Sequence, residues 1–231
     1  TNKPACGPKR GHGSVQPRFP LEPALDEAAV ALGIDPIEIR RRNAMSNGDT
    51  TINGFVLGSC GIRECLDRVE AASGWKARYR TLPPNRGLGI ATSMYISGTA
   101  YPIYPNEMPQ SGVMIRGDRS GRLTVFCGAN EIGQGSNAML AYIVAEETGV
   151  PVEHIAVVAG DTELTPVDLG SYSSRVTLMA GEAARQAGAA LGTWMAAAAG
   201  EHWGVTPDLV TRSLGAWHHG DRSLSTREVL E

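Results

Sequence analysis

A glycine-rich loop in the middle of the chain carries backbone N–H groups that could hold an anionic cofactor. The loop, 128–136, reads GANEIGQGS and follows a run, 123–127, that alternates as a half-buried β-strand does. Ser136 can cap a following helix, and Gly149 with Pro151 predicts where that helix ends. Because a helix N-terminus carries unpaired N–H groups and a partial positive charge, this loop suits a negatively charged group.

The residues of this loop leave the identity of the ligand open. Gly133, Gly135 and Ala138 match the G-x-G-x-x-A spacing of dinucleotide-binding loops, and Asp161 stands after the next predicted strand. The phosphate loop of nucleotide hydrolases is excluded, because Gln134 and Gly135 stand where that motif needs a lysine and a hydroxyl residue. A glycine-rich turn that binds nothing is the alternative.

Two other segments narrow the choice. Residues 7–16 read GPKRGHGSVQ, and residues 170–177 read GSYSSRVT. With the loop 128–136 between them, they resemble in order and separation three cofactor loops of the molybdenum hydroxylases, the xanthine dehydrogenase and aldehyde oxidase family. The helical region 21–43 is similar to the region that follows the family's first loop, GAxRGFGxxQ. The SYSSR wording at 171–175 is most similar to the 4-hydroxybenzoyl-CoA reductase branch.

The resemblance implies a fold and a cofactor. We expect an α+β chain with mixed sheets and packed helices, made of parts of two molybdopterin-binding domains, residues 1–83 and 84–231. The proline pair at 83–84 marks the boundary. The implied cofactor is molybdopterin with molybdenum, in its cytosine dinucleotide form, while [2Fe-2S] clusters and FAD are expected on partner domains or chains.

Matching the motifs residue by residue assigns the expected cofactor contacts. The resemblance implies that Arg10 lies beside the molybdenum, and that Gln134 donates its amide to a metal oxo group or to the cofactor. The serine loop is expected to bind pterin or phosphates through backbone N–H and hydroxyl donors. The expected cofactor-binding residues are Arg10, Gly11, Ile132, Gly133, Gln134, Gly135, Ser173, Ser174 and Arg175.

No catalytic residue and no metal-ligating side chain is assigned. The resemblance places the family's base, a glutamate, in a C-terminal motif that this sequence does not contain. We therefore expect a fragment or one piece of a split subunit, inactive alone, that works with the rest of the molybdenum subunit and with iron–sulfur and flavin subunits. The implied reaction is water-derived hydroxylation, or reductive dehydroxylation, of an aromatic, aldehyde or aryl-CoA substrate. The alternatives are a scaffold module without cofactor and a nicotinamide dinucleotide-binding domain.

Composition describes an ordinary globular protein. The 231 residues are 42% hydrophobic with a net charge of −3, so nothing favours nucleic acid, and the arginines 40–42 suit the solvated end of a helix. The alanine-rich stretch 183–199 is too short to span a bilayer. The spacing of the four cysteines fits no iron–sulfur site, so we expect buried, reduced thiols in a cytoplasmic protein. His218 and His219 suggest an exposed turn beside Trp217.

The remaining elements follow from local signals. We expect a helix over 20–32 that ends at Gly33, and a second that Asp35 caps, with Glu38 completing a capping box. A third helix, 59–74, would carry Cys60 and Cys65. Strands are expected at 88–92, 113–116, 123–127 and 155–158, with a hairpin between the second and the third.

Overall fold

The chain forms two compact units in the computed structural model, unit 1 (Thr1–Ile96) and unit 2 (Ser97–Glu231). The structure describes residues 7, 10–11, 13–94 and 111–231. Each unit has its own cluster of buried apolar side chains. The sequence-based boundary between residues 83 and 84 stays a prediction.

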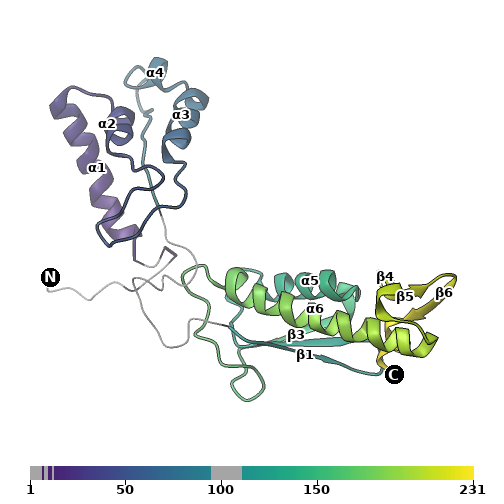
Figure 1. Cartoon of the computed structure of the whole chain (residues 1–231). Helices are drawn as coiled ribbons and strands as arrows, with labels where there is room; N and C mark the ends of the chain where they lie inside the picture. Colours follow the sequence, from purple (N-terminus) through teal and green to yellow (C-terminus); the bar gives the residue numbers. More distant parts are fainter. Residues whose placement is uncertain (1–6, 8–9, 12, 95–110) are drawn as a thin grey trace. The chain divides into compact units, whose positions relative to one another are not determined.

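Unit 1 is built from helices. They are, in chain order, α1 (Val15–Leu32), α2 (Pro36–Asn43), α3 (Ile62–Ser73) and α4 (Trp75–Arg78) (Figure 1). As predicted, α1 ends where Gly33 adopts a left-handed φ of 66°. It begins at Val15, before the predicted start, and Pro20 and Pro23 lie inside it. Because a proline inside a helix removes a backbone donor, the sequence pattern points to a start at Pro20 instead.

The cap of α2 is confirmed in part. The Asp35 carboxylate accepts a hydrogen bond from the backbone N–H of Ile37 at 2.7 Å. The predicted capping box is wrong, because Glu38 accepts instead from Arg42 at 2.7 Å and from Arg41 at 3.1 Å. Two guanidinium groups within reach compete successfully with one backbone N–H for the carboxylate.

The prediction of a solvated arginine run over 40–42 is wrong for Arg40, which is buried, whereas Arg42 is exposed and Arg41 is half-buried. The Arg40 guanidinium lies 2.8 Å from the carboxylates of Glu22 and Asp26 on α1. Glu22 also accepts a hydrogen bond from the Thr92 N–H at 3.0 Å. Burial acts to raise the pKa of Glu22, but the bonds from Arg40 and Thr92 outweigh it and hold that pKa below its ordinary value. Paired charges thus join α1, α2 and the segment at Thr92.

The small core of unit 1 consists of Ile37, Leu66 and Trp75. Leu88 and Ile90 pack against it, yet the predicted strand 88–92 does not form among the described residues. The segment is extended, but no described strand pairs with it, and a strand needs a partner for its backbone groups.

The cysteines depart from the expected burial. Cys127 is buried, Cys60 is half-buried and Cys65 is exposed, while Cys6 lies outside the described residues. Because α3 begins at Ile62, Cys60 precedes this helix rather than lying on it. Burial raises the pKa of the Cys127 thiol, so this thiol stays protonated.

Unit 2 holds a three-stranded mixed sheet in the order β1-β2-β3. Its strands are β1 (Val113–Gly117), β2 (Leu123–Cys127) and β3 (Ile155–Ala159). The predicted hairpin is confirmed, since β1 pairs antiparallel with β2, and β3 pairs parallel with β2 on its other side. Helices α5 (Ser136–Thr148) and α6 (Val176–Trp203) lie side by side on one face of the sheet (Figure 1). The α+β class with mixed sheets and packed helices is confirmed.

Small residues let α6 approach α5 closely. A Cβ on Gly181 would lie 3.1 Å from the Ile143 side chain, and one on Gly188 would lie 2.8 Å from Cβ of Glu147. Ala180 and Ala184 are fully buried in the core between helix and sheet. Helix α6, which contains the alanine-rich stretch 183–199, therefore packs on the sheet and on α5 together.

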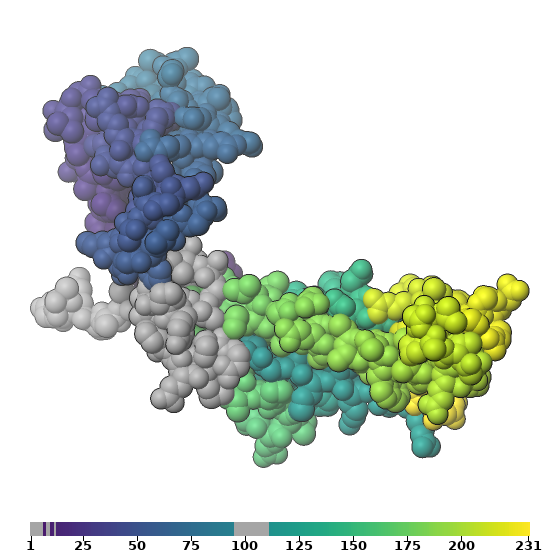
Figure 2. Space-filling view, viewed as in Figure 1, coloured from purple at the N-terminus to yellow at the C-terminus, as the bar shows by residue number. Residues whose placement is uncertain are grey.

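A second small sheet closes the far end of unit 2. It comprises β4 (Thr211–Ser213), β5 (Ala216–His219) and β6 (Arg222–Ser225), with α7 (Thr226–Leu230) after it, and the short 3-10 helices are η1 (Val152–His154) and η2 (Pro207–Leu209). Figure 2 shows these last residues, in yellow, gathered at the C-terminal end of α6. Trp217 on β5 is buried, so its prediction as part of an exposed turn is wrong. Within the described part of the chain, no helix is both long enough and apolar enough to cross a bilayer.

Candidate functional site

Two loops of unit 2 meet at one edge of the mixed sheet. Because β2 and β3 are parallel, the glycine loop (residues 128–135) and the serine loop (residues 170–175) both follow strand ends at the same edge. The Ser171 hydroxyl donates to the carbonyl oxygen of Asn130 at 2.5 Å, which joins the two loops directly. The glycine and serine loops therefore share one edge of the sheet.

The chain leading to the serine loop passes unusually close to the glycine loop. A Cβ at Gly128 would lie 2.7 Å from Cβ of Asp168, so only glycine allows this approach without displacement. The N–H of Gly160 donates to the Cys127 carbonyl at 3.0 Å, which continues the pairing of β2 with β3. The close approach of the two loops therefore depends on the backbone positions of Gly128 and Gly160.

The carboxylate of Glu131 binds the backbone N–H groups at the start of α5. It accepts hydrogen bonds from the N–H groups of Gly133 at 2.8 Å, Gly135 at 3.0 Å and Asn137 at 3.1 Å. These bonds, led by the one from Asn137, lower the pKa of Glu131 to about 2. The Ser136 hydroxyl also donates to Glu131 at 3.3 Å.

This arrangement corrects two predictions. Ser136 is the first helical residue and caps nothing, because Gly135 with a φ of 81° holds the cap position. The N–H groups expected to receive a ligand are instead bonded to the chain's own carboxylate. Sequence reasoning missed Glu131, although an acid just before two glycines of a helix-leading loop is the available signal.

Gln134 is engaged inside the same loop. Its Nε2 donates to the Asn130 carbonyl at 3.0 Å and to the Ser136 hydroxyl at 2.9 Å, and its Oε1 accepts from the Ile132 N–H at 2.6 Å. A backbone N–H needs an acceptor opposite it, so these partners define which end of the amide is oxygen. The Ile132 side chain is exposed at the tip of the loop.

The serine loop carries backbone strain. Ser173 and Ser174 both have a φ of 52°, a left-handed conformation that costs a residue other than glycine about 1–3 kcal/mol. Ser173 is buried and Ser174 is exposed. α6 begins directly after this loop, and among the described residues no side chain caps its first turn. Strain of this kind accumulates at ligand-binding sites.

Arg175 faces inward. Its guanidinium is fully buried and donates to Asp168 at 2.8 Å, to the Ser111 hydroxyl at 3.1 Å and to the Gly170 carbonyl at 3.2 Å. Its backbone N–H donates to the Tyr172 carbonyl at 3.1 Å. The side chain of Arg175 therefore stabilises the serine loop from its buried side.

The residues of the first predicted loop belong to unit 1. Arg10 is exposed with a φ of 38°, and Gly11 has a φ of 97°. A Cβ on Gly11 would lie 3.0 Å from the Ser14 hydroxyl, which donates to the Gly11 carbonyl at 2.6 Å. The turn before α1 thus depends on glycine at this position.

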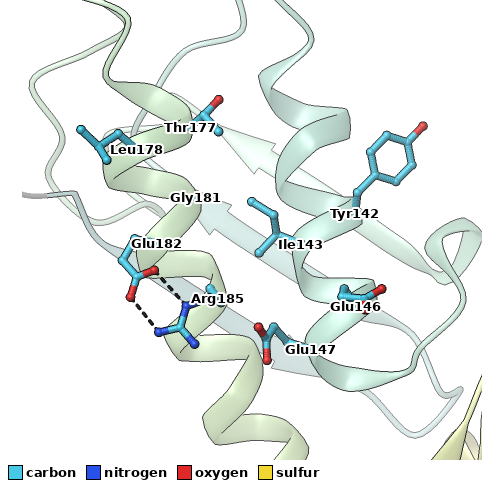
Figure 3. A pocket seen from close by; sticks show the side chains of 9 residues that line it. All are labelled: Tyr142, Ile143, Glu146, Glu147, Thr177, Leu178, Gly181, Glu182 and Arg185. Atoms are coloured by element: carbon cyan, nitrogen blue, oxygen red, sulfur yellow. Dashed lines mark hydrogen bonds and ion pairs between the residues drawn. The ribbon is translucent and has the colours of Figure 1, made fainter. Parts of the chain in front are cut away.

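Two further observations concern other possible binding sites. The described residues contain no group of three histidine, cysteine or acidic side chains placed to hold a metal ion. A groove runs between α5 and α6, with Tyr142, Ile143 and Leu178 along it, and Glu182 paired to Arg185 at 2.8 Å on its rim (Figure 3). Glu146, Glu147 and Thr177 also line this groove, which lies on the outer surface of the two helices rather than between the glycine and serine loops.

The sheet argues against a nicotinamide-binding domain. A doubly wound dinucleotide fold has a mostly parallel sheet with its glycine motif after the first strand. Here β1 is antiparallel to β2 and the glycine loop follows β2. Asp161 accepts from the N–H groups of Glu163 at 2.9 Å and Leu164 at 3.2 Å, so its carboxylate shapes a turn.

A mixed sheet with two cofactor-type loops at one edge places the chain in a class of α+β cofactor-binding domains. The chain belongs to the molybdopterin cofactor-binding domain family. One model of that description matches residues 66–231 and a second matches residues 1–44. The family predicted from the three loops is thereby confirmed, whereas the aryl-CoA reductase branch stays a prediction.

Individual relatives agree with this assignment. The xanthine dehydrogenase molybdenum-binding subunit of Escherichia coli O157:H7 is 38% identical over 194 residues, or 81% of this chain and 25% of that protein. The 6-hydroxypseudooxynicotine dehydrogenase complex subunit gamma of Paenarthrobacter nicotinovorans is 31% identical over 244 residues, or 99% of this chain and 30% of that protein. The crystal structure of quinoline 2-oxidoreductase from Pseudomonas putida 86 shares the fold, with a TM-score of 0.74 at 23% identity over 96% of this chain and 30% of that one. The chain thus spans 25–30% of the length of these proteins.

Proposed function

We propose that this chain supplies part of the molybdopterin-binding surface of a molybdenum-dependent oxidoreductase. The observation that carries the proposal is the Ser171–Asn130 contact, which brings the glycine and serine loops to one sheet edge. Both loops belong to the segment that matches the family model. When bound, the cofactor supplies redox chemistry at its molybdenum.

The donors of unit 2 fit such a cofactor. Ser174 is exposed in a strained loop, and no side chain within the described ranges caps the first turn of α6 that follows it, so this end suits an anionic group. Ser173 shapes the same turn from its buried position. We assign Gly133, Gln134, Gly135 and the exposed Ile132 to the opposite wall. Arg175 acts by bracing the loop.

For unit 1, we propose a separate cofactor contact at Arg10 and Gly11. The exposed Arg10 side chain offers a planar cation for an anion, and the adjacent Gly11 lets the backbone turn. The motif match at residues 1–44 supports this assignment.

The remaining proposals concern the whole enzyme. We propose the cytosine dinucleotide form of the cofactor, [2Fe-2S] and FAD on partner domains or chains, and a cytoplasmic complex that includes the rest of the molybdenum subunit. An aromatic, aldehyde or aryl-CoA substrate would be hydroxylated or reductively dehydroxylated. The relatives named as dehydrogenase subunits support such a complex. The base glutamate would come from outside these residues, so the purified 231-residue chain should show no turnover with dye acceptors.

Molybdenum and pterin content test the proposal. The chain is purified with any partner chains, and its molybdenum is measured by elemental analysis and its pterin by fluorescence after oxidation. Gln134→Ala should lower both, because the loop loses the amide that bonds Asn130, Ser136 and Ile132. Gln186→Ala is the control, since Gln186 is an exposed glutamine on α6 whose amide donates to Glu182 at 2.9 Å, away from both loops. A wild-type complex without molybdenum or pterin would instead indicate a scaffold module.

A further inference from the structure

Glu131 accepts several hydrogen bonds although it lies on the surface. Its two carboxylate oxygens accept from three backbone N–H groups, at Gly133, Gly135 and Asn137, and from the Ser136 hydroxyl. The three N–H groups alternate along the chain across the start of α5. One carboxylate therefore fixes the backbone of the loop from its second glycine into the helix.

The same carboxylate holds Gln134 indirectly. Gln134 lies between two residues whose N–H groups bind Glu131, and its Nε2 donates to Ser136, the hydroxyl that also donates to Glu131. With both sides of the peptide held, the amide is directed to Asn130 and Ile132. Losing the carboxylate would free the loop and the amide together.

The charge of Glu131 also decides where another anion can bind. With its pKa lowered to about 2, the side chain is ionised at neutral pH. A phosphate at the start of α5 would have to displace Glu131 or lie against its negative charge, and like charges at that distance repel. At the start of α6, Asp168 is paired with Arg175 at 2.8 Å. The start of α5 therefore carries a carboxylate charge without a paired cation in this loop, whereas the acid at the start of α6 is paired.

We propose that Glu131 is the resident anion of the glycine loop, a positioning residue that holds Gln134 and excludes phosphate groups from α5. This inference rests on the proposed cofactor function for its biological meaning. Its geometry concerns only the chain's own residues, so it can be tested without the loaded enzyme.

The first experiment uses inorganic pyrophosphate as the probe. The isotopically labelled 231-residue chain is titrated at pH 7, and the amide signals of Gly133, Gly135 and Asn137 are followed by NMR. In the wild type these signals should not move. Glu131→Gln keeps the size of the side chain and removes its charge. In this variant the three amide signals should move, with an apparent pyrophosphate dissociation constant at least tenfold lower than in the wild type. Glu228→Gln is the matched control, because Glu228 also accepts a backbone N–H at a helix start, from Ser225 at 2.7 Å, at the other end of unit 2.

Two outcomes would overturn the inference. Pyrophosphate-dependent shifts of these amides in the wild type would mean that a ligand displaces Glu131. No shifts in Glu131→Gln would mean that the carboxylate excludes nothing. If Glu131→Gln does not fold, Glu131→Asp keeps the charge on a shorter side chain and should leave the amides insensitive to pyrophosphate while shifting the Gln134 side-chain signals. Unchanged Gln134 signals in that variant would remove the positioning role.

A second readout separates this inference from the proposed function. In the complex, Glu131→Gln should lower pterin content, and Glu228→Gln should leave it at the wild-type level. If the wild-type complex holds no pterin, the proposed function fails, while the pyrophosphate titration still decides the role of Glu131. If the wild type is loaded and Glu131→Gln is loaded equally, the positioning role fails and the proposed function stands.

Discussion

Arg175 and Asp168 form an ion pair of 2.8 Å in which both side chains are completely buried. The pair lies beneath the serine loop, and Ser111 completes it by donating to Asp168 at 2.5 Å and accepting from Arg175 at 3.1 Å. A surface-binding arginine would leave its guanidinium in reach of solvent. This arginine instead connects the start of β1 to the start of α6, so the shape of the serine loop depends on charge pairing inside unit 2.

Removing one partner of this pair should be costly. Asp168→Ala leaves the Arg175 charge buried without its carboxylate, and we expect a loss of about 3–5 kcal/mol in the free energy of unfolding. Urea denaturation followed by circular dichroism measures it. Glu182→Ala removes an acid from the exposed pair with Arg185 on α6 and should cost far less. Equal losses in the two variants would contradict the structural role of the buried pair.

Gly128→Ala should destabilise unit 2 through a steric clash. The new Cβ would lie 2.7 Å from Cβ of Asp168, so the glycine loop or the chain before the serine loop must shift, at about 1–3 kcal/mol. The thermal midpoint should fall accordingly. Gly58→Ala serves as the control, because a Cβ there meets nothing within 4 Å. A wild-type midpoint in Gly128→Ala would show that the loops do not approach as closely as described.

Ser174→Gly should separate stability from binding. Glycine adopts a φ of 52° without strain, so the variant should unfold at the same or slightly higher denaturant concentration than the wild type. It lacks the exposed hydroxyl proposed to contact the cofactor, so pterin content of the complex should fall. Ser223→Ala, an exposed serine on β6, should change neither. Full loading of Ser174→Gly would remove the hydroxyl from the proposed site.

The Glu131 contacts predict a dependence of stability on acid. A folded-state pKa of about 2, below the ordinary value of 4.5, means that the contribution is complete above about pH 4.5 and is lost as the pH falls toward 2. Unfolding measured from pH 7 to pH 2 should show wild type and Glu131→Gln converging at the acid end. Parallel curves over the whole range would contradict the bonds from Gly133, Gly135 and Asn137.

Local signals in the sequence were sufficient for many elements. Gly33 and Gly149 end helices with left-handed φ values of 66° and 75°, and Asp35 caps α2. The turn after β1 forms the predicted hairpin. These features depend on residues close together in the chain, whose conformational preferences need no distant partner. The same holds for the three loop motifs, because each is a short run whose order along the chain is visible without a fold.

The sequence by itself therefore determined the family, the order of the loops and most local elements of this protein. Only the tertiary structure decided which of its charged residues are buried and which partners they have. The sequence predicts a solvated Arg40 and an Arg175 that contacts the cofactor, yet both are buried against acids that lie 18 and 7 positions away in the chain. The start of α5 reads as a vacant anion site, yet Glu131 fills it. A charge is buried only where the fold brings it an opposite partner, and which partner arrives depends on packing that no local pattern contains.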